Sequence, residues 1–138
     1  KEDDVATCAG QIDGLMRHKS KETGEWLYSI FDWKRVKPKY MLTEYEKAFD
    51  NAMFIMFPHI PITHYHKYSM QASLYAEMLQ QTTGIDVASR LYVLRVHNEL
   101  GEAQLVKLRN YRAEAAYLLE VLEVRGTDRE LPPWGVPY

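Results

Sequence analysis

The chain has 138 residues, of which 46% are hydrophobic and 26% are charged, and its formal net charge is -2. The length predicts one domain, residues 1–138, with a substantial core, and the mixture of residue types is that of a globular protein. The small negative charge argues against a generic nucleic-acid binder. No apolar run approaches the roughly 20 residues of a membrane helix, so we expect no membrane partner.

The first residues of the chain and its cysteine content indicate in which compartment the protein is expected. The charged start Lys1-Glu2-Asp3-Asp4 has no apolar stretch behind it, which argues against a signal peptide. The single cysteine, Cys8, precludes an internal disulfide and is typical of a reducing compartment. We therefore expect an intracellular protein.

The first half of the chain predicts an antiparallel hairpin. Residues 5–16 and 25–35 have strand-like composition, and the polar turn 18–24 between them ends on a glycine. Such a hairpin would bring Asp13 close to Asp32. Further along, Thr43-Glu44-Tyr45-Glu46 matches a capping box and predicts a short helix to about residue 54.

The second half predicts two helices and two strands. Pro58 and Pro61 interrupt the chain, and Thr63 is expected to cap a helix over 64–83 that ends at Gly84. The remaining expected elements are strands over 89–97 and 103–109, their turn over 98–102, a last helix from Asn110 to Gly126 and an extended tail over 126–138.

Asp32-Trp33-Lys34, at the end of the second expected strand, is the most informative feature for function. Strand side chains alternate between faces, so Asp32 and Lys34 point the same way. A carboxylate there can hold a hard divalent cation. An ammonium group beside it can position a water molecule or stabilise developing negative charge.

Three motifs in this order resemble the PD-(D/E)XK nuclease superfamily, and in particular its RecB-like exonuclease branch. The resemblance covers residues 5–97 and implies an α/β (α+β) fold, with a central mixed sheet of about four strands flanked by helices in a restriction-endonuclease-like core. The motifs are Gly10-Gln11-Ile12-Asp13, Asp32-Trp33-Lys34 and Gln71-Ala72-Ser73-Leu74-Tyr75.

The resemblance also implies the site. Asp13 and Asp32 would hold one or two Mg²⁺ or Mn²⁺ ions, with the backbone carbonyl of Trp33 as a further ligand. Lys34 would act on the attacking water, either as a base or by orienting it. Gln71 and Tyr75, neighbours on one helix face, would contact the substrate backbone or order the active site. The alternative reading makes Tyr75 a core aromatic residue and Gln71 its hydrogen-bond partner.

The implied function is metal-dependent hydrolysis of DNA. Two alternatives stay open: an RNA endonuclease of the same fold, and a catalytically silent nucleic-acid-binding or assembly module. Relatives usually carry a helix before the first strand, often with a glutamate that completes the metal site. This chain begins just before that strand, so we expect a domain cut from a larger protein or complex.

Basic residues gather around the expected site. Between Arg17 and Lys39 the chain has seven lysines and arginines against three acidic residues. This segment would hold phosphates by salt-sensitive contacts, or it is a solvated hairpin and loop. His64 and His66 would diverge on a helix and make a poor metal pair, and His97 is expected to be structural.

Overall fold

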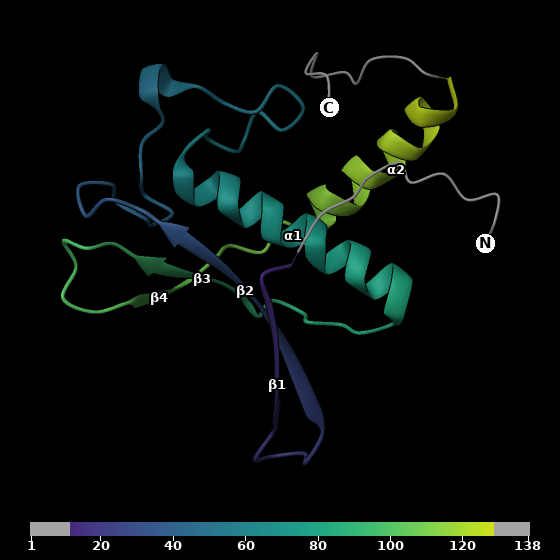
Figure 1. The fold of residues 1–138 in the computed structure, drawn as a ribbon. Coiled ribbons are helices and arrows are strands. Elements are labelled where there is room, and N and C mark those ends of the chain that lie inside the picture. The colour runs from purple at the N-terminus through teal and green to yellow at the C-terminus, as the bar shows by residue number, and fades with distance from the viewer. Residues whose placement is uncertain (1–11, 129–138) are drawn as a thin grey trace.

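A computed structural model of the chain describes residues 12–128 (Figure 1). It begins with the predicted hairpin, in which β1 (Gly14–Lys19) pairs antiparallel with β2 (Trp26–Arg35). The strand expected over 5–16 ends later than predicted, because β1 continues to Lys19. Residues 5–11 lie outside the described part. Nearly every β1 residue is exposed, so no alternation of apolar and polar residues marks this strand in the sequence.

The predicted α+β architecture is confirmed as a mixed sheet of four strands with two helices. The sheet has the order β1-β2-β3-β4, and β3 (Leu91–Val96) lies parallel to β2. The last strand, β4 (Gln104–Lys107), pairs antiparallel with β3. That this sheet is a restriction-endonuclease-like core stays a prediction.

The helix α1 (His64–Thr83) has the predicted boundaries. The Thr63 side chain accepts the His66 N–H at 3.1 Å, and Gly84 ends the helix with a φ of 79°, a conformation that glycine adopts without steric cost. Ala72 and Ala76 of α1 are buried in one cluster with Ile30 of β2. These small side chains let α1 lie close to the sheet.

The second helix, α2 (Arg112–Asp128), packs on α1 and makes no strand contacts within the described residues (Figure 1). Its predicted end at Gly126 is wrong, because the helix continues to Asp128. Residues 126–128 of the expected extended tail are therefore helical, and residues 129–138 lie outside the described part. A single glycine inside a helix costs only about 1 kcal/mol and does not end it by itself. Tyr111 and Ala115 contribute to a second buried cluster with Met70 of α1.

The helix expected from Thr43 to about Phe54 is wrong. The segment holds only η1 (Phe49–Asn51), a short 3₁₀ turn. The Thr43 hydroxyl accepts the Tyr45 N–H at 3.3 Å, which makes a local turn, and the Glu46 carboxylate accepts the Tyr65 N–H at 3.2 Å. The glutamate of the expected capping box therefore caps the start of α1 instead.

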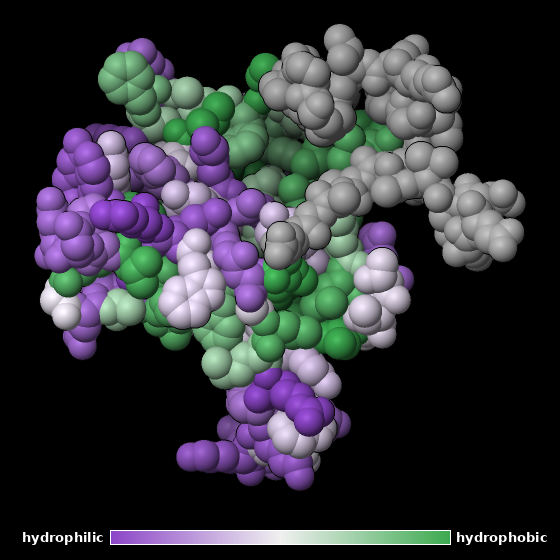
Figure 2. Space-filling view, in the orientation of Figure 1, coloured by the Kyte–Doolittle hydropathy of each residue, from purple (hydrophilic) through white to green (hydrophobic). Residues whose placement is uncertain are grey.

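Polar surface gathers at two places. Figure 2 shows hydrophilic side chains at the tip of the β1–β2 hairpin and over the loops at the opposite end of the sheet. Lys37 and Lys39, in the loop that follows β2, are exposed. Neither of the two described helices combines the length and the apolar character that a membrane crossing requires.

Candidate active site

Asp13 and Asp32 meet at the start of the hairpin, as the sequence predicts. Asp13 directly precedes β1, where Gly14 stands opposite Phe31, so the register places Asp13 across from Asp32. The two carboxyl groups lie close enough to interact by a hydrogen bond. The Asp13 carboxylate also accepts the Trp33 N–H, with an N to Oδ2 distance of 3.1 Å. A side chain from the edge strand thus takes the place of a backbone partner for β2.

Lys34 completes this group. Its Nζ lies 3.0 Å from Oδ2 of Asp32, and the side chains of Asp32 and Lys34 are 13% and 27% exposed. On its other side, Lys34 Nζ is 5.1 Å from the ring centroid of Tyr68 on α1. The ammonium group is therefore held between the carboxylate and the helix, on the sheet face that α1 covers.

Folding shifts the pKa values of the two carboxyl groups in opposite directions. Burial raises the pKa of Asp32, and its hydrogen bond with Asp13 raises it further. The hydrogen bond from Asp32 lowers the pKa of Asp13, and the Trp33 N–H lowers it as well. The two pKa values are therefore shifted apart, as those of close carboxyl groups are.

The donor set of this pair fits a hard divalent cation. Within residues 12–128 no group of three or more histidine, cysteine, aspartate or glutamate side chains is placed to hold a metal ion. Mg²⁺, however, is usually bound through one or two carboxylates and keeps several waters. The N–H and C=O of one residue point to the same edge of a strand, so the Trp33 carbonyl faces the edge where Asp13 lies. Asp13, Asp32 and this carbonyl could therefore hold Mg²⁺ or Mn²⁺.

Gln71 and Tyr75 form a hydrogen-bonded pair on α1. Gln71 Nε2 donates to the Tyr75 hydroxyl at 3.1 Å, both side chains are half-buried, and Tyr75 packs against the main core cluster. This arrangement is the one that the alternative, structural reading of the motif describes. The stripe that carries them also carries Tyr68, whose ring lies beside Lys34. That Gln71 and Tyr75 serve the Asp32–Lys34 site stays a prediction.

The histidines have structural contacts. His66 is buried, with Nδ1 2.8 Å from the Tyr111 hydroxyl and Nε2 3.0 Å from the Glu44 carbonyl oxygen. The Nδ1 of His97 accepts the Glu99 N–H at 3.1 Å and so supports the turn after β3. The expectation that His97 is structural is consistent with this bond.

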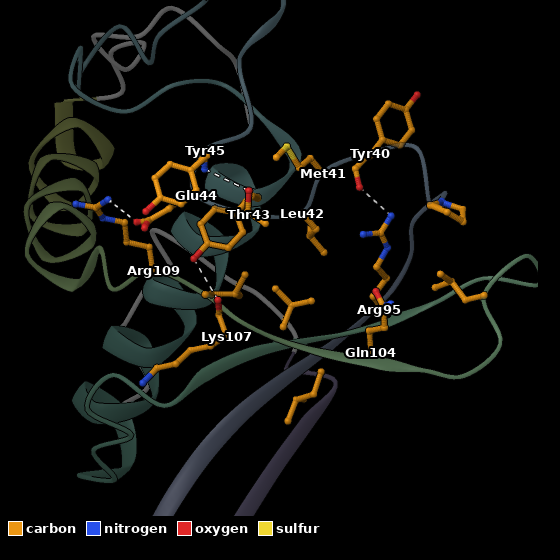
Figure 3. Close-up of a pocket in the computed structure, with 16 residues that line it drawn as sticks. Tyr40, Met41, Leu42, Thr43, Glu44, Tyr45, Arg95, Gln104, Lys107 and Arg109 are labelled. Carbon is orange, nitrogen blue, oxygen red and sulfur yellow. Dashed lines mark hydrogen bonds and ion pairs between the residues drawn. The ribbon is translucent and has the colours of Figure 1, made fainter.

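A groove of about 970 Å³ lies between the loop around Tyr40 and strand β4 (Figure 3). Arg95 extends from β3 to this loop and donates to the backbone carbonyls of Val36, Lys37 and Tyr40. None of the predicted site residues lines the groove. The carboxylates and Lys34 therefore occupy a separate place on the surface.

Sequence reasoning gave no role to Tyr40, His64 or Tyr68, although their rings lie in a row that reaches Lys34. The four-residue spacing of His64 and Tyr68 on the helix was a visible signal for part of this row. The contact with Tyr40 depends on the loop after β2, whose path no local pattern predicts.

Comparison with protein-family models, with curated proteins and with solved structures finds no match to this chain. The chain's own residues and their geometry must therefore support any assignment of function. They bring together Asp13, Asp32 and Lys34 from two strands.

Proposed function

We propose that this protein is a metal-dependent nuclease that hydrolyses phosphodiester bonds of DNA. One observation carries the proposal: Asp13, Asp32 and Lys34, three residues whose types suit this chemistry, converge at one point of the hairpin. Their order along the chain resembles the PD-(D/E)XK nucleases.

The chain's own groups have distinct tasks in this proposal. Asp13, Asp32 and the Trp33 carbonyl hold Mg²⁺ or Mn²⁺. The bound ion supplies a more acidic water and stabilises charge on the phosphoryl oxygens. Both carboxylates would bind the ion in their ionised form, so ion binding favours ionisation of Asp32, whose pKa burial raises.

Lys34 acts on the reacting atoms. Its ammonium group, 3.0 Å from Asp32, donates hydrogen bonds that orient the attacking water or stabilise the charge that develops on the phosphate. Gln71 and Tyr75 contact the substrate backbone from α1. Their mutual hydrogen bond fixes the direction of the glutamine amide.

The direct test is a cleavage assay on single- and double-stranded DNA and RNA with Mg²⁺, with Mn²⁺ and with a chelator. The parent should cleave DNA with either ion and not with the chelator. Lys34→Ala should lose cleavage by about 100-fold or more, because a positioned charged group contributes at least that much to such a step. Lys47→Ala, which removes an exposed lysine from the loop before η1, is the matched control and should cleave like the parent.

Cleavage by Lys34→Ala within a few-fold of the parent would remove this residue from the mechanism. Cleavage that persists unchanged in the chelator would contradict the metal-dependent reaction itself. Cleavage of RNA with DNA left intact would assign the same site to the alternative substrate.

A further inference from the structure

Three aromatic rings form a row on the surface between the loop after β2 and the first two turns of α1. The Tyr40 and His64 ring centroids are 4.5 Å apart, and those of His64 and Tyr68 are 6.3 Å apart. The rings are tilted to one another by 43° and 53°. They come from distant parts of the sequence, so the fold itself creates the row.

A lysine stands at each end of the row. Lys39 Nζ is 5.2 Å from the Tyr40 ring centroid, and Lys34 Nζ is 5.1 Å from the Tyr68 ring centroid. The row thus begins in the exposed basic loop after β2 and ends at the lysine of the candidate active site.

The row is open to solvent. The His64 side chain is 45% exposed, and Tyr40 and Tyr68 are partly exposed. Two acidic groups lie beside the row. Asp32 is paired with Lys34, and Glu46 is 11% exposed with its carboxylate engaged by the Tyr65 N–H and by His64. The row therefore presents its aromatic rings and the exposed Lys39 to solvent, and the Lys34–Asp32 pair lies at its inner end.

We propose that Tyr40, His64 and Tyr68 form a track that binds the bases of a single nucleic-acid strand and leads it to the Asp32–Lys34 pair. The direction of the track rests on the nuclease function proposed above, whereas the binding itself does not. Aromatic rings flanked by cations are the features that bind single strands, because every base has a face to stack and every nucleotide has a phosphate.

The same chemistry disfavours a duplex on this track. Bases of a duplex are already stacked on one another, so a protein can reach their phosphates more readily than their faces. Tyr40 also lines the groove beside β4, together with Lys107 and Arg109 (Figure 3). A strand that passes Tyr40 therefore finds Lys107 beyond the track, whereas Arg109 is paired with Glu44 of the same groove.

The test is binding in the presence of a chelator, where cleavage does not interfere. The probes are a fluorescent single-stranded oligothymidylate and a blunt DNA duplex, followed by fluorescence anisotropy. Tyr40→Ala and His64→Ala remove rings from the track. Tyr40→Phe keeps the ring, and Phe49→Ala removes an aromatic side chain that is 87% exposed and lies outside the track.

Each alanine variant should bind the single strand at least about fivefold more weakly than the parent, since stacking on one ring accounts for at least that factor. Tyr40→Phe and Phe49→Ala should bind it like the parent, and duplex binding should change in none of them. Single-strand affinities within twofold of the parent in both alanine variants would overturn the track. Equal losses of affinity for the single strand and for the duplex would also overturn the track.

A measurement on the parent protein covers the case in which a variant fails to fold. An oligonucleotide that carries 4-thiothymidine is bound to the protein and the complex is irradiated. The crosslinked residues are then identified by mass spectrometry. Adducts on Tyr40, His64 or Tyr68 support the track, and adducts confined to other segments overturn it. If binding follows the track but no metal supports cleavage, the proposed nuclease function fails and the binding site stands.

Discussion

At the scale of single residues, the two aspartates of the candidate site differ in what folding does to them. The folded structure disfavours the ionised form of Asp32, whose pKa is raised mainly by burial, and favours that of Asp13, whose pKa is lowered by hydrogen bonds. A raised pKa means that the ionised group opposes folding above that pKa, and a lowered pKa means the reverse. Two residues of one type should therefore respond oppositely to the same substitution.

Asp32→Asn should raise the melting temperature of the metal-free protein at neutral pH, and Asp13→Asn should lower it. The gain from Asp32→Asn should vanish as the pH falls through the Asp32 pKa, because the parent carboxyl is then protonated as well. Thermal unfolding in a chelator, followed by circular dichroism over a pH series, measures both effects. A lower melting temperature for Asp32→Asn at neutral pH would show that its ion pair with Lys34 outweighs burial and the Asp13 contact.

At the scale of elements, α1 joins the sheet to α2 through small polar side chains. The Ser69 hydroxyl accepts the Arg109 N–H at 3.1 Å, and the Ser73 hydroxyl accepts the Tyr111 N–H at 2.9 Å. Each hydroxyl also donates to the carbonyl one turn earlier in α1. These serines hold the segment that runs from β4 into α2.

Ser73→Ala should destabilise the protein by about 1–3 kcal/mol, because it leaves the buried Tyr111 N–H without its partner. Thr82→Ala is the matched control, since Thr82 makes the same bond to its own helix but is exposed. Urea unfolding of both variants measures the difference. Equal stability of the two variants would show that water replaces the serine at this amide.

Gln71→Ala tests the role of the α1 motif. If Gln71 contacts substrate, cleavage should fall by more than the loss of folding stability explains, since a half-buried hydrogen bond contributes at most about 1 kcal/mol. Cleavage rate and urea stability are measured on the same preparation. A variant that loses stability but cleaves at the parental rate would assign the Gln71–Tyr75 pair to the core alone.

At the scale of the whole molecule, the features that could be predicted from the sequence are the local ones. Thr63 and Gly84 fix the ends of α1 because both caps act within a turn of the helix. The Glu46 cap acts across 19 residues, and the pattern around Thr43 therefore predicted the wrong helix. Exposed β1 carries no apolar alternation, so its end was also missed.

The candidate site shows the same division. Asp13, Asp32 and Lys34 could be predicted because a hairpin fixes their neighbours, and the register then follows. The ring of Tyr68 beside Lys34 could not, because it depends on how α1 lies across the sheet. Contacts between residues that are separated by one helical turn or one hairpin can thus be predicted from the sequence. Contacts between a helix and the sheet can be identified only once the fold is known.

Calorimetric titration with Mn²⁺ at neutral pH measures whether Asp13 and Asp32 hold one cation. The parent should bind Mn²⁺, and Asp13→Asn and Asp32→Asn should each bind it at least about tenfold more weakly, since losses of that size follow even from changes outside the ligands themselves. Asp50→Asn, at an exposed aspartate in η1, should bind like the parent. Unchanged Mn²⁺ affinity in both site variants, or no Mn²⁺ binding by the parent, would contradict the metal site.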